Sequence, residues 1–261
     1  YLTRISVGCA VRFFSAYAMI RSIVQSFLRI VDPPMTQILL IRHATNDFVK
    51  TGRLAGWTPG VHLNDEGRAQ AEALGARLAD MPIQHIYSSP LERTMETAQA
   101  VAMHHPGLEI LQTPEVGEVQ YGDWQGELVA ALTKRKMWHV IQEYPSRASF
   151  PNGETMRGVQ ERAVNAVEAI AARHPRQTVV IVSHADLIKA ALAHYLGVHF
   201  DLFQRIGVSP CSVSVVQITR FGPMVMRLND DGPLKLEPEK EEPPKEEAKA
   251  VEEATAGIGE T

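Results

Sequence analysis

Short apolar runs alternate with longer amphipathic runs through the middle of the chain, and this alternation constrains the fold more than any other feature. The apolar runs have the length of single strands: QILLI (37–41), HIYSS (85–89), LEILQ (108–112), TVVIVS (178–183) and SVSVVQI (212–218), with MVMRL (224–228) as a possible edge strand. The stretches between them carry apolar residues at helical spacing. Strands that alternate with helices are typical of an α/β fold with a mostly parallel central sheet.

The amphipathic runs also carry the signals that start and stop helices. Helices are predicted over residues 64–80, 88–105, 154–174 and 185–197. Asn64 and the acids after it suit a helix start, and Ser89 with Pro90 suits an N-cap followed by a first turn. Gly197 suits a helix end. The buried face of the first helix is expected to hold Ala69, Ala73, Leu74 and Leu78.

The two ends of the chain differ from its middle. Residues 1–34 are apolar, aromatic and basic, but Arg12 and Arg21 interrupt each run before the ~20 apolar residues of a membrane span. They are interpreted as an extension, amphipathic at most or outside the native domain, with a signal peptide or a membrane-surface anchor as alternatives. Residues 231–261, rich in Pro, Glu and Lys, are expected to form a disordered acidic tail. One compact domain is expected over 35–230.

Composition excludes several classes of function. The chain has 261 residues, 45% of them hydrophobic, which suffices for one sizeable core. A formal net charge of -4 gives no excess of basic surface, so nucleic acid is not an expected partner. Cys9 and Cys211 lie far apart and indicate neither a disulfide framework nor a zinc site, so a cytoplasmic location is the default expectation.

Two histidines stand directly after buried strands. His43 follows QILLIR and His184 follows TVVIVS, and ligands of open α/β sheets bind beyond the carboxyl ends of the strands. A lone histidine at a strand end is more often structural than catalytic. Here Arg42, Arg93 and Glu118 accompany the pair, and two guanidinium forks match the oxygens of a phosphate. The pattern therefore predicts a site for a dianion.

Six ordered motifs resemble those of one known family. They are LLIRHAT, RLAGWTPGVHLNDEGRAQAEAL, IYSSPLERTMETA, GEVQYGDWQG, FPNGETM and VSHADLIKAAL. In this order they resemble the histidine phosphatase superfamily, in its phosphoglycerate mutase-like branch, over residues 36–230. The resemblance implies a three-layer α/β/α sandwich and phosphoryl transfer through a phosphohistidine, with no metal and no cofactor.

The resemblance also implies roles for individual residues. His43 would be the nucleophile, and Arg42, Arg93 and His184 would bind the phosphoryl oxygens. Glu118 would protonate the leaving oxygen and then activate water, for which it needs a raised pKa. Three further residues are expected at the substrate: Asn46, Gly56 and Trp57. The nucleophile would also need its other ring nitrogen held as a donor, typically by a backbone carbonyl.

The chain departs from the family pattern at two positions. Ala44 stands where the family has glycine, which would cause strain if the backbone there needed a positive φ. Val49 stands where the family has a phosphate-binding asparagine. Asn46 or Thr45 could supply the missing donor. Four other histidines, His104, His105, His194 and His199, show no ligand pattern, so no metal site is predicted.

The activity expected from these features is hydrolysis of small phosphomonoesters by a metal-independent histidine phosphatase. The GDWQG form resembles broad-specificity phosphatases, and the segment after it, 126–152, is short for a mutase. Lys134, Arg135 and Lys136 in that segment are either a solvated helix face or a grip on a second acidic group. The alternatives are a phosphoglycerate mutase or other phosphomutase, and a weakly active phospho-ligand binding or scaffold protein. The expected assembly is a monomer or a homodimer.

Overall fold

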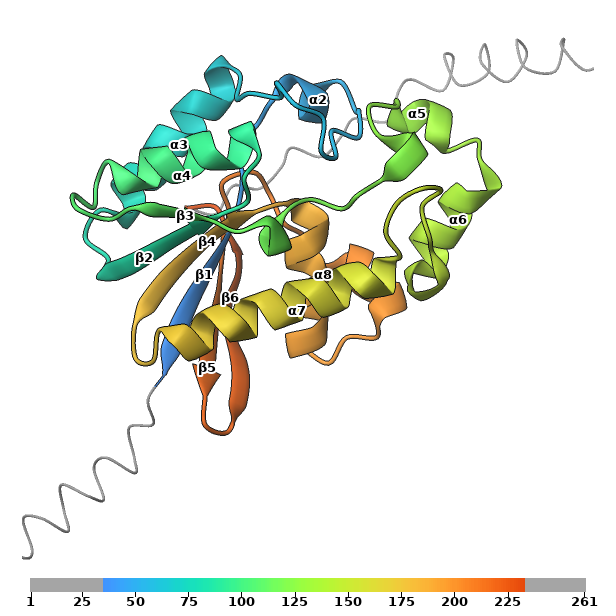
Figure 1. Cartoon of the computed structure of the whole chain (residues 1–261). Helices are drawn as coiled ribbons and strands as arrows, with labels where there is room; N and C mark the ends of the chain where they lie inside the picture. Colours follow the sequence, from blue (N-terminus) through green and yellow to red (C-terminus); the bar gives the residue numbers. More distant parts are fainter. Residues whose placement is uncertain (1–34, 233–261) are drawn as a thin grey trace, which may run out of the picture. The chain divides into compact units, whose positions relative to one another are not determined.

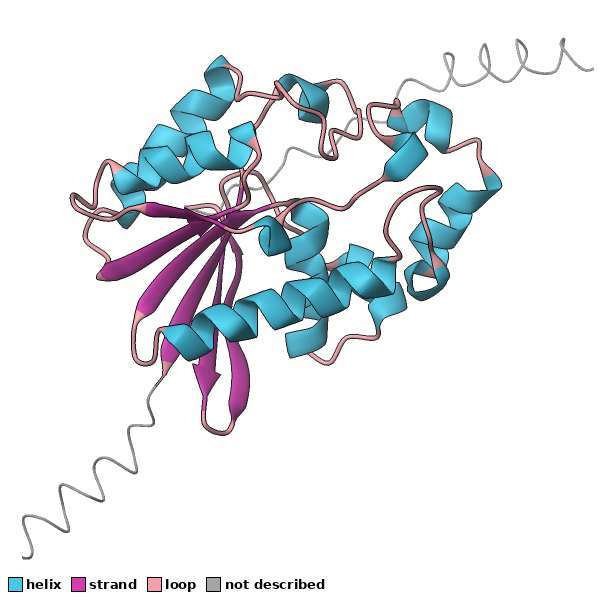
Figure 2. Ribbon diagram, in the orientation of Figure 1, coloured by secondary structure: helices cyan, strands magenta, loops and turns pink. Residues whose placement is uncertain are grey.

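The computed structural model describes residues 35–232, so the expectations for residues 1–34 and for the tail beyond residue 232 lie outside the described part. Six strands form one sheet in the order β3-β2-β4-β1-β5-β6 (Figures 1 and 2). Their bounds are β1 Thr36–Arg42, β2 Ile83–Ser88, β3 Ile110–Gln112, β4 Thr178–Ser183, β5 Val213–Thr219 and β6 Gly222–Asp230. Only β5 runs against the others, which confirms the mostly parallel sheet.

The centre of the sheet explains the continuous apolar runs. β4 lies between β2 and β1, and all six of its residues are buried, because a parallel strand inside a sheet is covered on both faces. The parallel register of β1 and β4 sets Arg42 beside Ser183. The residues that follow these strands, His43 and His184, therefore leave the sheet side by side at its carboxyl edge.

Helices cover both faces of the sheet, which confirms the three-layer α/β/α sandwich (Figure 1). α3 (Asp65–Leu78) and α4 (Glu92–Ala102) pack on one face, and α7 (Met156–Arg173) and α8 (Ala185–Tyr195) pack on the other. Shorter helices, α2 (Asp47–Lys50), α5 (Val129–Leu132) and α6 (Lys136–Glu143), lie in the connections beyond the carboxyl edge. In residues 35–232 no helix is long and apolar enough to cross a bilayer.

Two predicted details of the helices were wrong. α4 begins at Glu92 with Leu91 as its N-cap residue, so Ser89 is not the cap. Ala69 and Ala73 of α3 are exposed. Its buried face is made by Gly67, Ala71, Leu74, Gly75 and Leu78.

The glycines on the buried face of α3 explain the second error. A Cβ on Gly67 would lie 1.9 Å from the Thr45 carbonyl oxygen, and one on Gly75 would lie 2.4 Å from that of Ala100. The helix backbone approaches its neighbours too closely for a side chain at these positions. A search for apolar side chains alone therefore finds Leu74 and Leu78 but misses the glycines of this face.

Candidate active site

A cavity of about 240 Å³ lies beyond the carboxyl edge of the sheet. Its lining combines the end of β1, the segment around α2, the first turn of α4, the Glu118 loop and the starts of α5 and α8. The residues used below are Arg42, His43, Asn46, Phe48, Val49, Leu54, Arg93, Glu118, Tyr121 and Val129. The fold thus brings together groups from distant parts of the sequence, as the strand-end pattern predicted.

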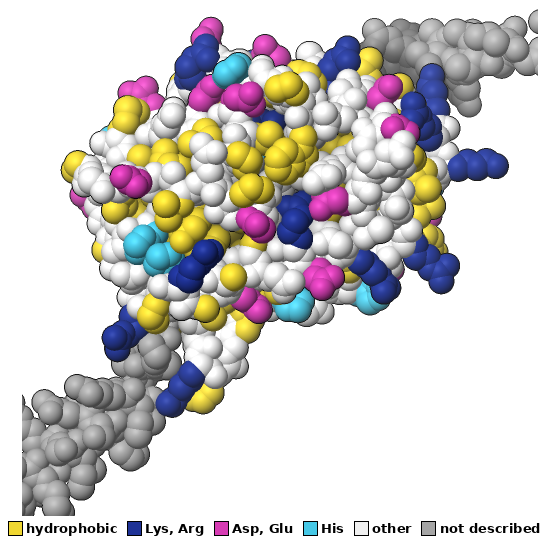
Figure 3. Space-filling view, viewed as in Figure 1, with side chains coloured by type: hydrophobic (Ala, Val, Ile, Leu, Met, Phe, Trp, Pro, Cys, Tyr) yellow, Lys and Arg dark blue, Asp and Glu magenta, His cyan; other side chains and the backbone are white. Residues whose placement is uncertain are grey.

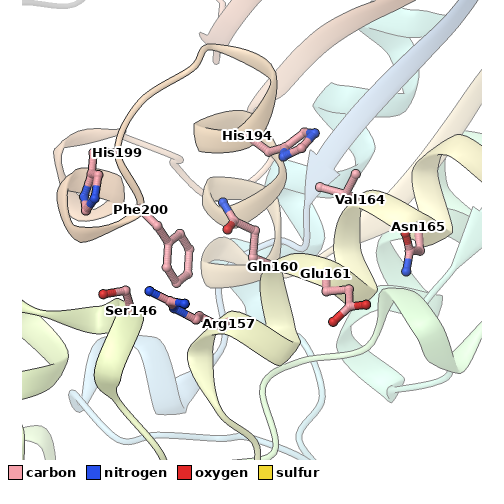
Figure 4. A pocket seen from close by; sticks show the side chains of 9 residues that line it. All are labelled: Ser146, Arg157, Gln160, Glu161, Val164, Asn165, His194, His199 and Phe200. Atoms are coloured by element: carbon pink, nitrogen blue, oxygen red, sulfur yellow. The ribbon is translucent and has the colours of Figure 1, made fainter.

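A larger cavity of about 510 Å³ lies elsewhere, between α7, the end of α8 and the 3-10 helix Phe200–Arg205 (Figure 4). Arg157 and Glu161 of α7 line it together with His194 and His199. It holds no pair of arginines and none of the predicted site residues. Volume alone does not identify the site, so the chemistry of the lining decides in favour of the smaller cavity.

His43 is held as a neutral imidazole with one free ring nitrogen. Its Nδ1 lies 2.7 Å from the carbonyl oxygen of Ala44. A carbonyl only accepts hydrogen bonds, so Nδ1 carries the proton and Nε2 keeps its lone pair. Burial, with the nearby charges of Arg93 and Arg42, lowers the pKa of His43 well below its usual value. The imidazole is therefore neutral near pH 7.

The two arginines present donors that no described residue satisfies. Arg42 Nη1 donates to the carbonyl oxygen of Val208 at 2.7 Å, and Arg93 Nη2 donates to that of Gly56 at 2.8 Å. Arg42 Nε, Arg93 Nε and Arg93 Nη1 are buried and make no hydrogen bond to residues 35–232. Unpaired charged donors are costly inside a protein. Their presence beside His43 indicates a site for a ligand with several anionic oxygens.

His184 lies between Arg93 and Ser89, next to the His43 ring. Its Nδ1 accepts from Arg93 Nη2 at 3.3 Å, so its Nε2 carries the proton and donates to Ser89 Oγ at 2.9 Å. The ring centroids of His43 and His184 are 5.2 Å apart. Burial and Arg93 lower the pKa of His184 well below its usual value, so this ring is also neutral.

Glu118 can exchange a proton near neutral pH. Its side chain is buried, Oε1 accepts from the Val119 backbone N–H at 3.0 Å, and Oε2 lies 3.6 Å from His184 Nδ1. Burial raises the pKa of Glu118 to about 7, against the opposing charge of Arg93. A carboxyl with this pKa is present in both protonation states near neutrality, as a group that both gives and takes a proton requires.

Asn46 offers a further donor to the cavity. Its Oδ1 caps α2 by accepting from Val49 N at 3.0 Å, whereas its buried Nδ2 makes no hydrogen bond to any described residue. Val49 itself is 38% exposed on α2 and has no polar group to offer. Of the two replacement donors considered from the sequence, Asn46 lines the cavity and Thr45 does not.

Ala44 shows no sign of the strain considered from the sequence. It is not among the described residues that adopt a positive φ, so the backbone there does not need glycine. Its N–H donates to Thr97 Oγ1 at 3.0 Å, and its side chain is fully buried. The alanine is therefore compatible with a working site.

Gly56 and Trp57 lie behind the cavity wall and do not line it. Gly56 has a φ of +52, and a Cβ there would lie 2.8 Å from Gln125 Oε1, so the position needs glycine. The indole N–H of Trp57 donates to the backbone carbonyl of Glu118 at 2.7 Å. These contacts support Arg93 and Glu118 rather than reach a ligand.

The basic cluster of residues 134–136 also lies outside the cavity lining. All three side chains are exposed, and the Arg135 guanidinium lies 5.6 Å from the ring centre of Trp124. From the segment 126–152 only Val129 lines the cavity. The geometry thus favours the solvated helix face over a grip on a second acidic group.

Two participants were not identified as site residues from the sequence. Ser89 was assigned to a turn or a cap, but its hydroxyl lies against His184. Tyr121 lines the cavity and donates to Asp186 Oδ2 at 3.1 Å, and burial raises its pKa well above the usual value, so it keeps its proton. Its position three residues after Glu118 was the available signal.

Apolar side chains form the remaining wall of the cavity. Phe48, Val49 and Leu54 lie on or just after α2, and Val129 faces them from α5. Apolar side chains are also exposed next to α2 on the face shown in Figure 3. A ligand anchored on the two arginines would therefore turn its other end toward a small apolar wall.

Comparisons with known proteins agree with this geometry. The profile of the histidine phosphatase superfamily (branch 1) matches residues 38–231. Phosphoserine phosphatase 1 of Hydrogenobacter thermophilus is 31% identical over 200 residues, which cover 75% of this chain and 92% of the relative. A probable phosphoglycerate mutase, GpmB of Erwinia tasmaniensis, is 26% identical over 184 residues, 70% of this chain and 85% of the relative.

The fold recurs in solved structures. A mutant phosphoserine phosphatase from Entamoeba histolytica, crystallised with phosphoserine, superposes with a TM-score of 0.70. The match covers 77% of this chain and 100% of the other, at 20% sequence identity. At that identity the likeness establishes the shared fold.

Proposed function

The chain belongs to the histidine phosphatase superfamily (branch 1), and we propose that it hydrolyses small phosphomonoesters through a phosphohistidine formed on His43. One observation carries the proposal. A buried imidazole with a free Nε2 lies in the same cavity as two arginines that have unsatisfied buried donors. That arrangement supplies both a nucleophile and a receptor for the phosphoryl oxygens.

In the first step the phosphoryl group is held by Arg42 and Arg93 while His43 Nε2 attacks phosphorus. The N–P bond forms as the bond to the leaving oxygen breaks. Protonated Glu118 gives its proton to that oxygen, so the product leaves as a neutral alcohol. The Nδ1–H bond to Ala44 stabilises the positive charge that develops on the ring.

In the second step water replaces the histidine. Ionised Glu118 takes a proton from the water, the oxygen attacks phosphorus, and the N–P bond breaks. Inorganic phosphate leaves, His43 is again neutral with its proton on Nδ1, and Glu118 is again protonated. One residue thus serves as acid and base, for which its pKa of about 7 is suited.

We propose that the reaction needs no metal ion. Phosphoryl transfer depends mainly on positioning and on neutralising the oxygen charge. Arg42 and Arg93 carry two positive charges, and Arg93 is completely buried. The Asn46 amide adds a neutral donor.

The cavity favours small substrates. Its volume of about 240 Å³ leaves room for a phosphoryl group and a short leaving group against Phe48, Val49, Leu54 and Val129. The relative from H. thermophilus is named a phosphoserine phosphatase, which makes phosphoserine the first substrate to test. The physiological substrate belongs, in this proposal, to the class of small phosphorylated metabolites.

A mutase is the second candidate, because a relative is named a probable phosphoglycerate mutase. A mutase must retain the phosphorylated product and return the phosphoryl group to it. The exposed positions of Lys134, Arg135 and Lys136, outside the cavity lining, supply no second anion site for this purpose. A coupled isomerisation assay separates the two activities.

A weakly active binding or scaffold protein is the third candidate. The features that favour it are the two departures from the family pattern, Ala44 and Val49, and the acidic tail. The backbone at Ala44 is unstrained, and Asn46 Nδ2 is available to replace the donor that Val49 lacks. Neither departure therefore argues strongly for this candidate. Phosphate bound covalently to His43 during turnover would exclude this candidate.

We assign the activity to residues 35–230 and propose that residues 1–34 and 231–261 lie outside the catalytic domain. We also propose that the enzyme is cytoplasmic and is a monomer or a homodimer. It is not expected to bind nucleic acid. Phosphate release by the full chain and by a 35–230 fragment tests the boundary. Sedimentation of the full chain measures the assembly state.

The defining experiment is a panel of phosphomonoesters assayed with EDTA present. Release of phosphate by the wild-type chain, and none by His43→Ala, would support the proposal. Absence of release from every ester, or full activity of His43→Ala, would contradict it. Activity that EDTA removes and a metal restores would contradict metal independence alone.

A further inference from the structure

Arg162 of α7 lies directly behind the loop that carries Glu118. Its Nη1 donates to the carbonyl oxygens of Glu115 at 2.8 Å and Gly117 at 3.0 Å. Its Nη2 donates to the Glu118 carbonyl oxygen at 3.3 Å and to Glu154 Oε2 at 2.9 Å, and its Nε donates to Glu154 Oε1 at 2.9 Å. All five N–H donors of the guanidinium are therefore engaged, three of them by this loop.

Glu154 fixes the guanidinium and the far side of the loop together. Its carboxylate forms a bidentate pair with Arg162, and both side chains are about one-fifth exposed. Glu154 Oε2 also accepts from Gln120 N at 2.9 Å, and Glu154 N donates to the Gln120 carbonyl at 2.9 Å. The Arg162–Glu154 pair thus contacts the backbone before, at and after Glu118.

Other contacts leave this loop little room to move. Ser183 Oγ donates to the Val116 carbonyl at 2.7 Å, and Trp57 donates to that of Glu118. A Cβ on Gly117 would lie 2.3 Å from the Trp57 ring. Of these side chains, only the Arg162–Glu154 pair forms hydrogen bonds with more than one residue of the loop.

The Glu118 carboxyl itself has few anchors. Within residues 35–232 it accepts one hydrogen bond, from the next residue, Val119 N, and its Oε2 lies 3.6 Å from Nδ1 of the neutral His184 ring. The position of the carboxyl is therefore set mainly by the loop backbone. From this geometry we propose that Arg162, paired with Glu154, is the positioning residue for proton transfer by Glu118.

This inference rests on the proposed function, and it has a particular consequence for substrate preference. A displaced carboxyl protonates the leaving oxygen poorly but leaves the attack of His43 intact. Alkyl esters, whose leaving oxygen is strongly basic, need that proton. Aryl esters such as p-nitrophenyl phosphate leave as stable anions and need it far less. Loss of Arg162 should therefore lower hydrolysis of alkyl esters selectively.

The test measures kcat/KM for phosphoserine, or for the best alkyl ester of the panel, and for p-nitrophenyl phosphate in the full chain. The variants are Arg162→Lys, which keeps the charge without the fork, and Glu154→Gln, which keeps the shape without the charge. Arg157→Lys, on the same helix but beside the other cavity, is the matched control. The ratio of the two kcat/KM values is independent of the folded fraction, so partial misfolding does not mask the result.

We expect the alkyl-to-aryl ratio to fall roughly tenfold or more in Arg162→Lys and Glu154→Gln, since general acid catalysis contributes about 10²–10⁴-fold in total. Glu118→Gln should move it further in the same direction, and Arg157→Lys should leave it within about twofold of the wild-type value. The alkaline limb of the alkyl-ester profile should also move to lower pH in the Arg162 and Glu154 variants, because a looser loop admits water to Glu118.

Equal losses for both esters in both variants would show a purely structural role and overturn this inference alone. A wild-type protein that hydrolyses neither ester would overturn the proposed function as well. The two failures are therefore distinguishable.

Discussion

The imidazole of His43 donates from Nδ1 to the carbonyl oxygen of its own neighbour, Ala44, across 2.7 Å. This bond fixes both the tautomer and the direction of the ring, and it leaves the Nε2 lone pair free, as the proposed attack on phosphorus requires. It also gives a structural role to the histidine that directly follows the buried strand β1. The Ala44 backbone is in turn held by the hydrogen bond from its N–H to Thr97 Oγ1 at 3.0 Å.

The pH dependence of hydrolysis should follow Glu118. The first step needs its protonated form, so kcat/KM for an alkyl ester should be high below pH 7 and fall as the pH rises through about 7. For p-nitrophenyl phosphate, kcat/KM should fall much less over the same pH range. Initial rates from pH 5 to pH 9 measure both profiles, and a limb unchanged in Glu118→Gln would contradict the assignment.

Arg93→Lys should retain the positive charge but lose the planar set of guanidinium N–H donors. The lysine has no equivalent of the Nε and Nη1 donors that face the cavity. A charge-assisted hydrogen bond of about 1.5–3 kcal/mol corresponds to a fall in kcat/KM of roughly 10- to 100-fold. Arg157→Lys serves as the control, and a loss no larger than in that control would remove Arg93 from the phosphate site.

Asn46 combines two roles that one substitution can separate. Asn46→Ser keeps an oxygen able to cap α2 and loses the Nδ2 donor, so stability should change by less than about 1 kcal/mol while kcat/KM falls several-fold. Asn46→Ala should lose both functions. Urea unfolding measures the stability and steady-state assays measure the activity; if serine matched the wild type in both, the Asn46 amide would have no part in binding phosphate.

The raised pKa of Glu118 should cost stability at alkaline pH. Its ordinary value is 4.5, and burial raises it to about 7, so the folded state binds a proton that the unfolded state has lost. The contribution to stability therefore falls as the pH rises between these values and stays low above 7. Glu118→Gln should raise the free energy of unfolding at pH 8 by on the order of 1–3 kcal/mol and leave it nearly unchanged at pH 4. No gain at pH 8 would mean that Glu118 is better solvated than its burial indicates.

The sequence was sufficient to predict the part of the site that depends on strand ends. Arg42 ends β1, and His43 and His184 directly follow β1 and β4, whose parallel pairing puts them side by side. Glu118 and Arg93 could be assigned because they stand in motifs of a known family. The fold class followed from the alternation of apolar and amphipathic runs.

Other features depend on packing that the sequence pattern does not contain. Ser89 looked like a helix cap, but the parallel pairing of β2 with β4, which sets Ser88 beside Val182, places its hydroxyl against His184. Leu74 and Leu78 of α3 were predicted correctly, but Ala69 and Ala73 were not, because glycines make the closest contacts of its buried face. Arg162 occupies an ordinary helix position in the sequence, and its role emerges only from the three loop carbonyls around it.

The most direct test of the central claim is covalent phosphate on His43 during turnover. We expect rapid alkaline quenching of the wild-type chain with an alkyl ester to yield acid-labile, alkali-stable phosphate on a peptide that contains His43. Glu118 variants should change its amount, and His43→Ala should lack it. Phosphate release at the full wild-type rate with no trapped phosphohistidine, or in His43→Ala, would contradict the mechanism.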